Sequence, residues 1–135
     1  GNNLAPETTT HIHNAVQGGL NYLGICAGGF LAGHASYNSL NLTSGVRFDF
    51  YSAANQGIRK TAVTITAVDT PPLEHYWEDG PQFTGWGAVV GKYPDGTPAI
   101  VEGRSGDGWV ILCVDHAYAA TLIRAALDRT WLPHF

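Results

Sequence analysis

The sequence has 135 residues, of which 44% are hydrophobic, and its formal net charge is −4. This length and composition are typical of one globular domain with a core of its own, and they exclude a disordered chain. No run of Lys and Arg is present, and no apolar stretch reaches the roughly 20 residues that span a bilayer. We therefore expect one domain over residues 1–135, with neither nucleic acid nor a membrane among its partners.

The first third of the sequence predicts a helix, a short strand and a second helix. Pro6 with an acidic residue beside it favours a helix start, so we expect a helix over 6–17 that a glycine pair then ends. Residues 20–25 form a short apolar run bounded by glycines, which predicts a buried strand. The small, apolar residues over 28–36 predict a helix packed closely on a sheet, and the polar stretch after it holds one expected short strand, over 46–51.

The remaining sequence predicts four strands and a final helix. Residues 61–68 (TAVTITAV) are rich in β-branched side chains and predict a strand, which the proline pair 71–72 is expected to end. Residues 119–129 predict an amphipathic helix. Helices and strands in this order favour an α/β fold with a largely parallel sheet. The three other strands, with Gly-containing turns between them, are expected over 86–92, 98–103 and 109–115.

The start of the sequence predicts that the domain lacks an N-terminal portion. The helix expected from residue 6 has no strand before it, although an α/β sheet of this kind begins with one. The opening GNNLAPE has the character of the end of a strand-to-helix loop. We therefore expect a missing strand and helix, and a further segment or a partner chain that completes the sheet.

A glycine-rich turn surrounds one of the two cysteines. Gly24-Ile25-Cys26-Ala27-Gly28 has the spacing G-x-nucleophile-x-G, in which the nucleophile lies on a sharp turn between a strand and a helix. The glycines leave room where side chains would collide with the strand and the helix. The start of the helix would favour a Cys26 thiolate, and the N–H of Ala27 could donate to an oxyanion. The alternative is a buried structural cysteine in a tightly packed corner.

His116 is the histidine best placed to serve as a base for this thiol. It follows the strand expected over 109–115, and functional groups gather at the carboxyl ends of strands in an open parallel sheet. Asp115 beside it is expected to point to the opposite face of that strand. The alternative role for His116 is to cap the helix that follows. No cluster of carboxylates or cysteines has the spacing of zinc ligands, so neither a metal nor another cofactor is expected.

Three segments carry a resemblance to a known superfamily: GGLNYLGICAGGFLAG (18–33), LEHYWEDGPQF (73–83) and VILCVDHAY (110–118). They are similar to the class I glutamine amidotransferase-like superfamily, which includes the DJ-1/PfpI proteins, and most of all to its branch named for the N-terminal domain of eukaryotic biotin-protein ligases. The resemblance implies a flavodoxin-like sandwich, with a mostly parallel central sheet and helices on both faces. It also implies Cys26 as the nucleophile, His116 as its partner and a second oxyanion donor near Gly1.

The sequence departs from that superfamily at Tyr118, which stands where its members have a glutamate two residues after the histidine. The segment around Tyr76, Trp77 and Gly80 could line a substrate pocket beside the thiol, or could be ordinary core. We therefore expect a Cys-His hydrolase or amidase that acts on a small-molecule or peptide-like substrate. Two alternatives remain: a non-catalytic binding or regulatory domain of this fold, and a DJ-1-type redox sensor in which Cys26 is oxidised.

Overall fold

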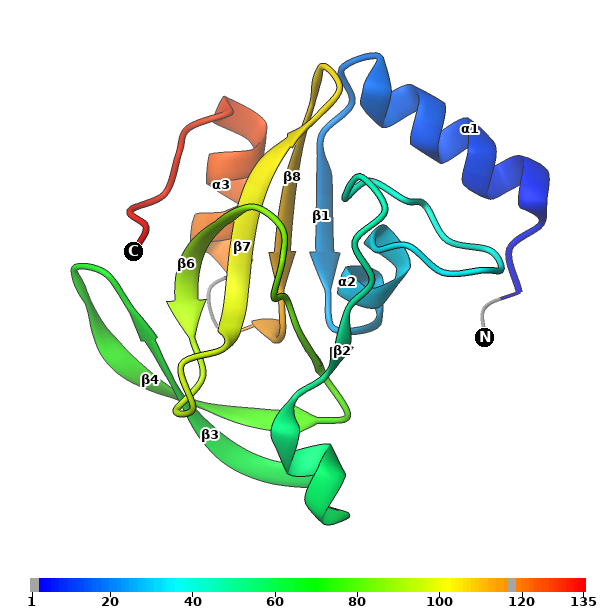
Figure 1. Ribbon diagram of the computed structural model, residues 1–135. Coiled ribbons are helices and arrows are strands. Elements are labelled where there is room, and N and C mark those ends of the chain that lie inside the picture. Colours follow the sequence, from blue (N-terminus) through cyan, green and yellow to red (C-terminus); the bar gives the residue numbers. More distant parts are fainter. Residues whose placement is uncertain (1–2, 117–118) are drawn as a thin grey trace.

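A curled six-stranded sheet forms the centre of the computed structural model, which describes residues 3–116 and 119–135 (Figure 1). Across this sheet the strands follow the order β1-β8-β7-β6-β3-β4. Their bounds are β1 (Tyr22–Ile25), β3 (Lys60–Ala67), β4 (Thr70–Glu78), β6 (Ala88–Lys92), β7 (Pro98–Ser105) and β8 (Gly108–Cys113). A separate two-stranded sheet consists of β2 (Asp49–Phe50) and β5 (Pro81–Gln82). The helices are α1 (Pro6–Gln17), α2 (Ala27–Ala32), the 3-10 helix η1 (Ser52–Gln56) and α3 (Ala119–Asp128).

The sheet is mixed rather than mostly parallel. Within the described residues, β1 and β8 are its one parallel pair, and all other neighbouring strands run antiparallel. The tight turn between β6 and β7 is closed by the N–H of Gly96, which donates to the carbonyl of Tyr93 at 2.9 Å. A parallel connection needs a dozen or more residues, so turns of this length make antiparallel pairs. The predicted flavodoxin-like, mostly parallel sheet is therefore wrong, and the sheet curls into a half-barrel.

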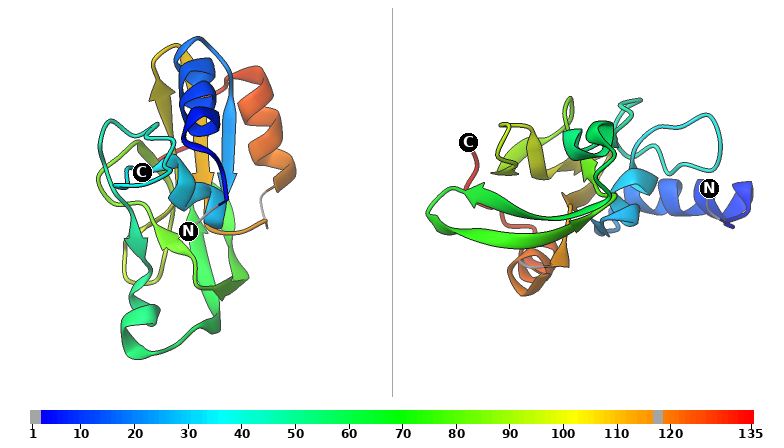
Figure 2. Two further views of the ribbon diagram at one scale, coloured as in Figure 1. Left: turned by 90° about the vertical axis from the view of Figure 1, so that its right-hand side faces the viewer. Right: turned by 90° about the horizontal axis from the view of Figure 1, so that it is seen from below.

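The α-helices lie at one end of the sheet, against β1 and β8 (Figures 1 and 2). On one face, Val16 of α1 and Ala32 of α2 share a core cluster with Val110 of β8. On the other face, Leu122 of α3 packs in a cluster with Ile111 of β8. The β3–β4 hairpin curves away from this end, so the expected sandwich, with helices on both faces of a mostly parallel sheet, does not form (Figure 1). No helix in the described part of the chain combines the length and apolar character needed to span a bilayer.

Strand β8 anchors both core clusters, because all six of its residues are buried. Alternate side chains of a strand point to opposite faces of the sheet. Trp109, Ile111 and Cys113 therefore join one cluster, and Val110 and Leu112 join the other. Full burial of one aliphatic side chain stabilises a fold by roughly 1.5–3 kcal/mol. The buried strand β8 thus holds in position both the residues that follow it and the neighbouring strand β1.

Local sequence patterns placed many of the elements, but β4, β5 and η1 were not predicted, and two further expectations are wrong. The bounds of α1, β3 and α3 agree with prediction to within one residue. The helix expected over 28–36 ends at Ala32, because the chain then turns and the N–H of His34 donates to the carbonyl of Val46 at 2.8 Å. The proline pair 71–72 does not separate strands but lies inside β4. β4 is the outermost strand and its pairing is irregular near these prolines, so their missing N–H groups are tolerated.

Candidate functional site

The chain turns sharply at Cys26, between β1 and α2, as the glycine spacing predicts. Cys26 has φ 52° and ψ −111°, outside the regions that most non-glycine residues occupy. Its N–H donates to the carbonyl of Cys113 at 2.8 Å, which continues the pairing of β1 with β8 and fixes the turn. Because α2 begins at the next residue, the thiol lies at the carboxyl end of β1.

Close packing requires glycine at position 24 but not at position 28. A Cβ on Gly24 would lie 2.6 Å from the carbonyl oxygen of Gly28 and 2.8 Å from Cε1 of Tyr22. A Cβ on Gly28 would meet only the Tyr22 hydroxyl oxygen, at 3.6 Å. The crowded position in α2 is Gly29, where a Cβ would lie 2.7 Å from Cζ of Phe83. The prediction that close packing requires glycine is therefore confirmed at Gly24. In the helix, the residue that must lack a side chain is Gly29 rather than Gly28.

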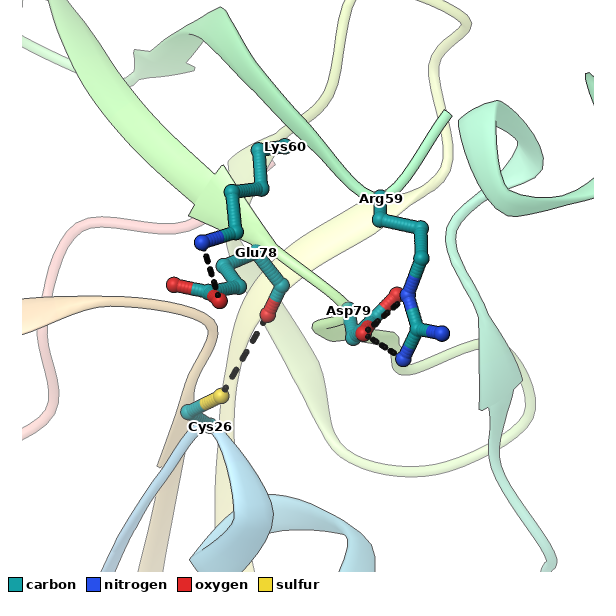
Figure 3. Close-up of polar contacts among 5 residues, drawn as sticks. All are labelled: Cys26, Arg59, Lys60, Glu78 and Asp79. Atoms are coloured by element: carbon teal, nitrogen blue, oxygen red, sulfur yellow. Dashed lines mark hydrogen bonds and ion pairs between the residues drawn. The ribbon is translucent and has the colours of Figure 1, made fainter. Parts of the chain in front are cut away.

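The half-buried Cys26 thiol faces the end of β4 (Figure 3). Its Sγ lies 3.9 Å from the carbonyl oxygen of Glu78. The Lys60 Nζ pairs with the Glu78 carboxylate at 3.1 Å, and Arg59 pairs with Asp79 at 2.6 Å. These pairs are largely exposed, so their contribution to stability is small. They nevertheless engage the charged side chains shown around the thiol, and the sulfur itself contacts a neutral carbonyl (Figure 3).

The structure does not bring His116 into hydrogen-bond contact with the thiol. The His116 side chain is 77% exposed, and its Nδ1 lies 3.5 Å from Oδ1 of Asp115. Its backbone N–H donates to the same carboxylate oxygen at 2.5 Å. The expectation that Asp115 points away from His116 is wrong, because β8 ends at Cys113 and strand alternation does not extend to these residues. Within the described residues, no hydrogen bond joins His116 to Cys26.

His75, which the sequence patterns did not single out, lies close to the same carboxylate. Its side chain is fully buried, and its Nδ1 lies 3.3 Å from Oδ2 of Asp115. Burial lowers the pKa of His75, and the Asp115 carboxylate opposes this shift. In β4, His75 and Trp77 are buried while the residues beside them are exposed. This pattern of burial places His75 on the inward face of β4.

The second thiol, Cys113, is protected. It is fully buried, and its Sγ contacts the carbonyl oxygen of Asp115 at 2.8 Å. Burial raises the pKa of Cys113 to about 12, so it stays protonated at neutral pH. The two cysteines are both free. Cys26 is therefore the thiol that a reagent in solution can reach.

The aromatic residues expected beside the thiol point to different sides of β4. Tyr76 is 62% exposed, whereas Trp77 is 1% exposed, as alternation along a strand requires. The indole N–H of Trp77 donates to the carbonyl of Gly80 at 3.2 Å. A Cβ on Gly80 would lie 2.8 Å from Cγ2 of Val114, so the turn packs directly on the end of β8. Trp77 and Gly80 thus stabilise this turn from within the core.

Three predicted residues remain: Ala27, Gly1 and Tyr118. Ala27 is exposed at the first position of α2. Gly1 and Tyr118 lie outside the described residues. Among the residues that the structure describes, no group of three or more His, Cys, Asp or Glu side chains could hold a metal ion.

Comparison with known proteins gives structural similarity alone. No protein-family model matches the sequence, and no curated protein matches it. The β-galactosidase from Bacillus circulans sp. alkalophilus superimposes with a TM-score of 0.61 at 13% identity, covering 97% of this chain and 22% of that chain. Gan42B, a GH42 β-galactosidase, superimposes with a TM-score of 0.62 at 13% identity, covering 96% of this chain and 20% of that chain. The exo-β-1,4-mannosidase Op5Man5 from Opitutaceae bacterium strain TAV5 superimposes with a TM-score of 0.51 at 19% identity, covering 93% of this chain and 21% of that chain.

These findings correct the resemblance to the amidotransferase-like superfamily. The similar structures are chains of glycoside hydrolases, and the sheet is mixed and curled. The predicted Cys-His hydrolase or amidase is therefore wrong, and the alternatives that depended on that superfamily lose their basis with it. The chain spans about a fifth of the length of the enzymes that it matches.

Proposed function

We propose that this chain is a non-catalytic accessory domain of a larger carbohydrate-active enzyme. The observation that carries the proposal is unequal coverage, because the similar structures match 93–97% of this chain but only 20–22% of their own. A fold that fills one part of a glycoside hydrolase chain is suited to act as one domain of such an enzyme. Since a fold can carry many functions, the role of the domain has to be argued from its own side chains.

The arrangement of carboxylates supports a role without catalysis. Most glycosidases use two carboxyl groups on either side of the scissile bond, roughly 5–9.5 Å apart. Among the described residues, the pocket lined by Asp49 and those lined by Asp128 each hold a single carboxylate. Glu78 and Asp79 are engaged in ion pairs with basic side chains. Glu102 is fully buried, and its Oε1 accepts a backbone N–H of the C-terminal tail, so it is out of reach of a substrate.

Among the residues that the structure describes, no base makes a hydrogen bond to the Cys26 thiol. A cysteine nucleophile is activated by a base within hydrogen-bond distance or by a charged neighbour that lowers its pKa. The Cys26 sulfur contacts the Glu78 carbonyl, and the exposed His116 ring is directed to Asp115. This supports a structural role for the turn at Cys26, which joins β1 to α2.

The test is an assay of the purified chain with 4-nitrophenyl β-D-galactopyranoside and 4-nitrophenyl β-D-mannopyranoside. We expect no release of nitrophenol above the rate in buffer, and the same result for Asp49→Asn and Asp128→Asn. These two variants change the carboxylates that line pockets and leave the buried ones intact. Hydrolysis that rises with protein concentration and is lost in either variant would overturn the proposal.

A further inference from the structure

The segment between α2 and β2 is a loop held in place along its length. The N–H of Leu40 donates to the carbonyl of Leu31 at 2.9 Å, and the N–H of Leu42 donates to the carbonyl of Ala32 at 2.8 Å. Leu40 and Leu42 are 1% exposed and belong to the core cluster on this face. The loop is therefore fixed to α2 from beneath, and the side chains on its outer surface are preorganised.

Two adjoining hollows open between this loop and α2. One has a volume of about 440 Å³ and is lined by α2 together with Tyr37. The other has a volume of about 270 Å³ and lies between His34 and Phe50. Phe30 and Ala35 line both, so the hollows share a wall. The larger hollow falls in the range of roughly 300–1,000 Å³ that small-molecule sites occupy, and the smaller hollow, at about 270 Å³, lies just below that range.

Aromatic rings contribute to the apolar lining of both hollows. Tyr37 is 71% exposed and Phe50 is 52% exposed. The rings of Phe30 and Phe50 lie 4.8 Å apart between centroids at an interplanar angle of 59°, so Phe30 supports Phe50. Covering exposed aromatic surface with an apolar ligand face is favourable.

Three polar side chains line the hollow beside Phe50: His34, Arg47 and Asp49. Within the described residues, none of these side chains has an ion pair or a side-chain hydrogen bond. Arg47 offers a planar set of donors, Asp49 offers only acceptors, and the His34 ring can do either. Adjacent hydroxyl groups both donate and accept, so they match such a set of side chains.

We infer that this pair of hollows binds a neutral pyranose sugar, with its C–H face over Phe50 and its hydroxyl groups on Arg47 and Asp49. An anionic ligand could pair with Arg47, but it would place a like charge beside the Asp49 carboxylate, which can only accept hydrogen bonds. A purely apolar ligand would remove water from three polar side chains without replacing their hydrogen bonds. The inference rests on the proposed function, because it gives the accessory domain its ligand.

The test is a titration of the 15N-labelled chain with methyl β-D-galactopyranoside, methyl β-D-mannopyranoside and β-1,4-mannobiose. We expect saturable NMR shift changes at residues 30–50 for at least one of these sugars. Phe50→Ala and Arg47→Ala should each raise its Kd by about tenfold or more, because stacking or a charged donor is lost. Tyr76→Ala is the matched control, since Tyr76 is an exposed aromatic residue outside the hollows, and it should change Kd by less than about twofold.

Two outcomes would overturn the sugar site. Either none of the three sugars gives a saturable change, or the changes map elsewhere and both variants bind as the wild type does. Phe50 and Arg47 are exposed, so the spectra of the variants should keep the dispersion of the folded chain. A chain that binds no sugar and hydrolyses no glycoside refutes the site alone, whereas hydrolysis refutes the accessory role.

Discussion

Replacing Gly24 with alanine perturbs the closest contact between β1 and α2. The added Cβ would lie 2.6 Å from the carbonyl oxygen of Gly28 and 2.8 Å from its carbonyl carbon, where ordinary contacts are 3.4–4 Å. These atoms belong to the backbone of α2 and cannot rotate away, so the strand and the helix must separate. Overpacking of this kind costs about 1–3 kcal/mol, and contact with backbone favours the upper end of that range. We expect Gly24→Ala to lower the free energy of unfolding by about 3 kcal/mol.

Gly28→Ala is the matched control, four residues away in the same corner. Its Cβ would meet only the Tyr22 hydroxyl, at the ordinary distance of 3.6 Å. That hydroxyl donates to the carbonyl of Gly28 at 2.7 Å, and the alanine leaves this carbonyl in place. Alanine is favoured over glycine in a helix interior by about 1 kcal/mol, and by less at the second residue of α2, so the variant should be neutral or slightly more stable. The two variants should thus differ by about 3–4 kcal/mol.

The assay is urea unfolding followed by tryptophan fluorescence, with the free energy of unfolding extrapolated to water. A domain of this length usually unfolds in one cooperative step, which permits the comparison. Gly24→Ala with the stability of the wild type would refute the reasoning. So would a loss in Gly28→Ala as large as that in Gly24→Ala, because the spacing of strand and helix would then not be set at Gly24.

Three further predictions concern titratable groups. Burial raises the pKa of Glu102, because the folded protein favours the protonated carboxyl group. The contribution of Glu102 to stability is therefore fully present below the pKa of the unfolded chain, and it is lost as pH rises through the pKa of the folded protein. The free energy of unfolding of Glu102→Gln, measured relative to that of the wild type, should therefore rise by on the order of 1 kcal/mol from about pH 4 to about pH 8. If urea unfolding gives the same difference between the two proteins at both pH values, the prediction is contradicted. Iodoacetamide should label Cys26 and spare Cys113 in the native protein, since burial raises the Cys113 pKa to about 12; equal labelling by mass spectrometry would show that this core opens. Asp115→Asn should lower the pKa of His75 further, because it removes the carboxylate that opposes the effect of burial. If the NMR titration of the His75 imidazole is unchanged in this variant, Asp115 does not interact with His75.

The turns between the last strands already contained the information that decides strand direction. Pro94-Asp95-Gly96 and Gly106-Asp107-Gly108 stand between expected strands, and both connections are too short to join parallel neighbours. The prediction of a parallel sheet followed instead from the order of helices and strands and from the resemblance. Local patterns were sufficient for the elements themselves, since propensity and turn chemistry act over a few residues. Strand pairing is a contact between elements, and it has to be worked out from every connection.

The predictions for the site also differ according to whether they depend on residues that are neighbours in sequence or on contacts between elements. The turn at Cys26 and the need for Gly24 follow from residues that are neighbours in sequence, and the spacing of glycines identified them. The position of His116 depends on where β8 ends, which a pattern of apolar residues does not define to one residue. The burial of His75 depends on which side of β4 faces the half-barrel, and that side is set by the curl of the whole sheet.

The parallel pairing of β1 with β8 also has a consequence for the order of folding. Tyr22 pairs with Val110, so most of the chain must close into a loop before β1 has a neighbour. The hairpins β3–β4, β6–β7 and β7–β8 join residues close in sequence and can form early. During synthesis α1, β1 and α2 leave the ribosome without the strand on which they pack. The nascent chain therefore exposes the apolar side chains of β1 until the residues of β8 have been added.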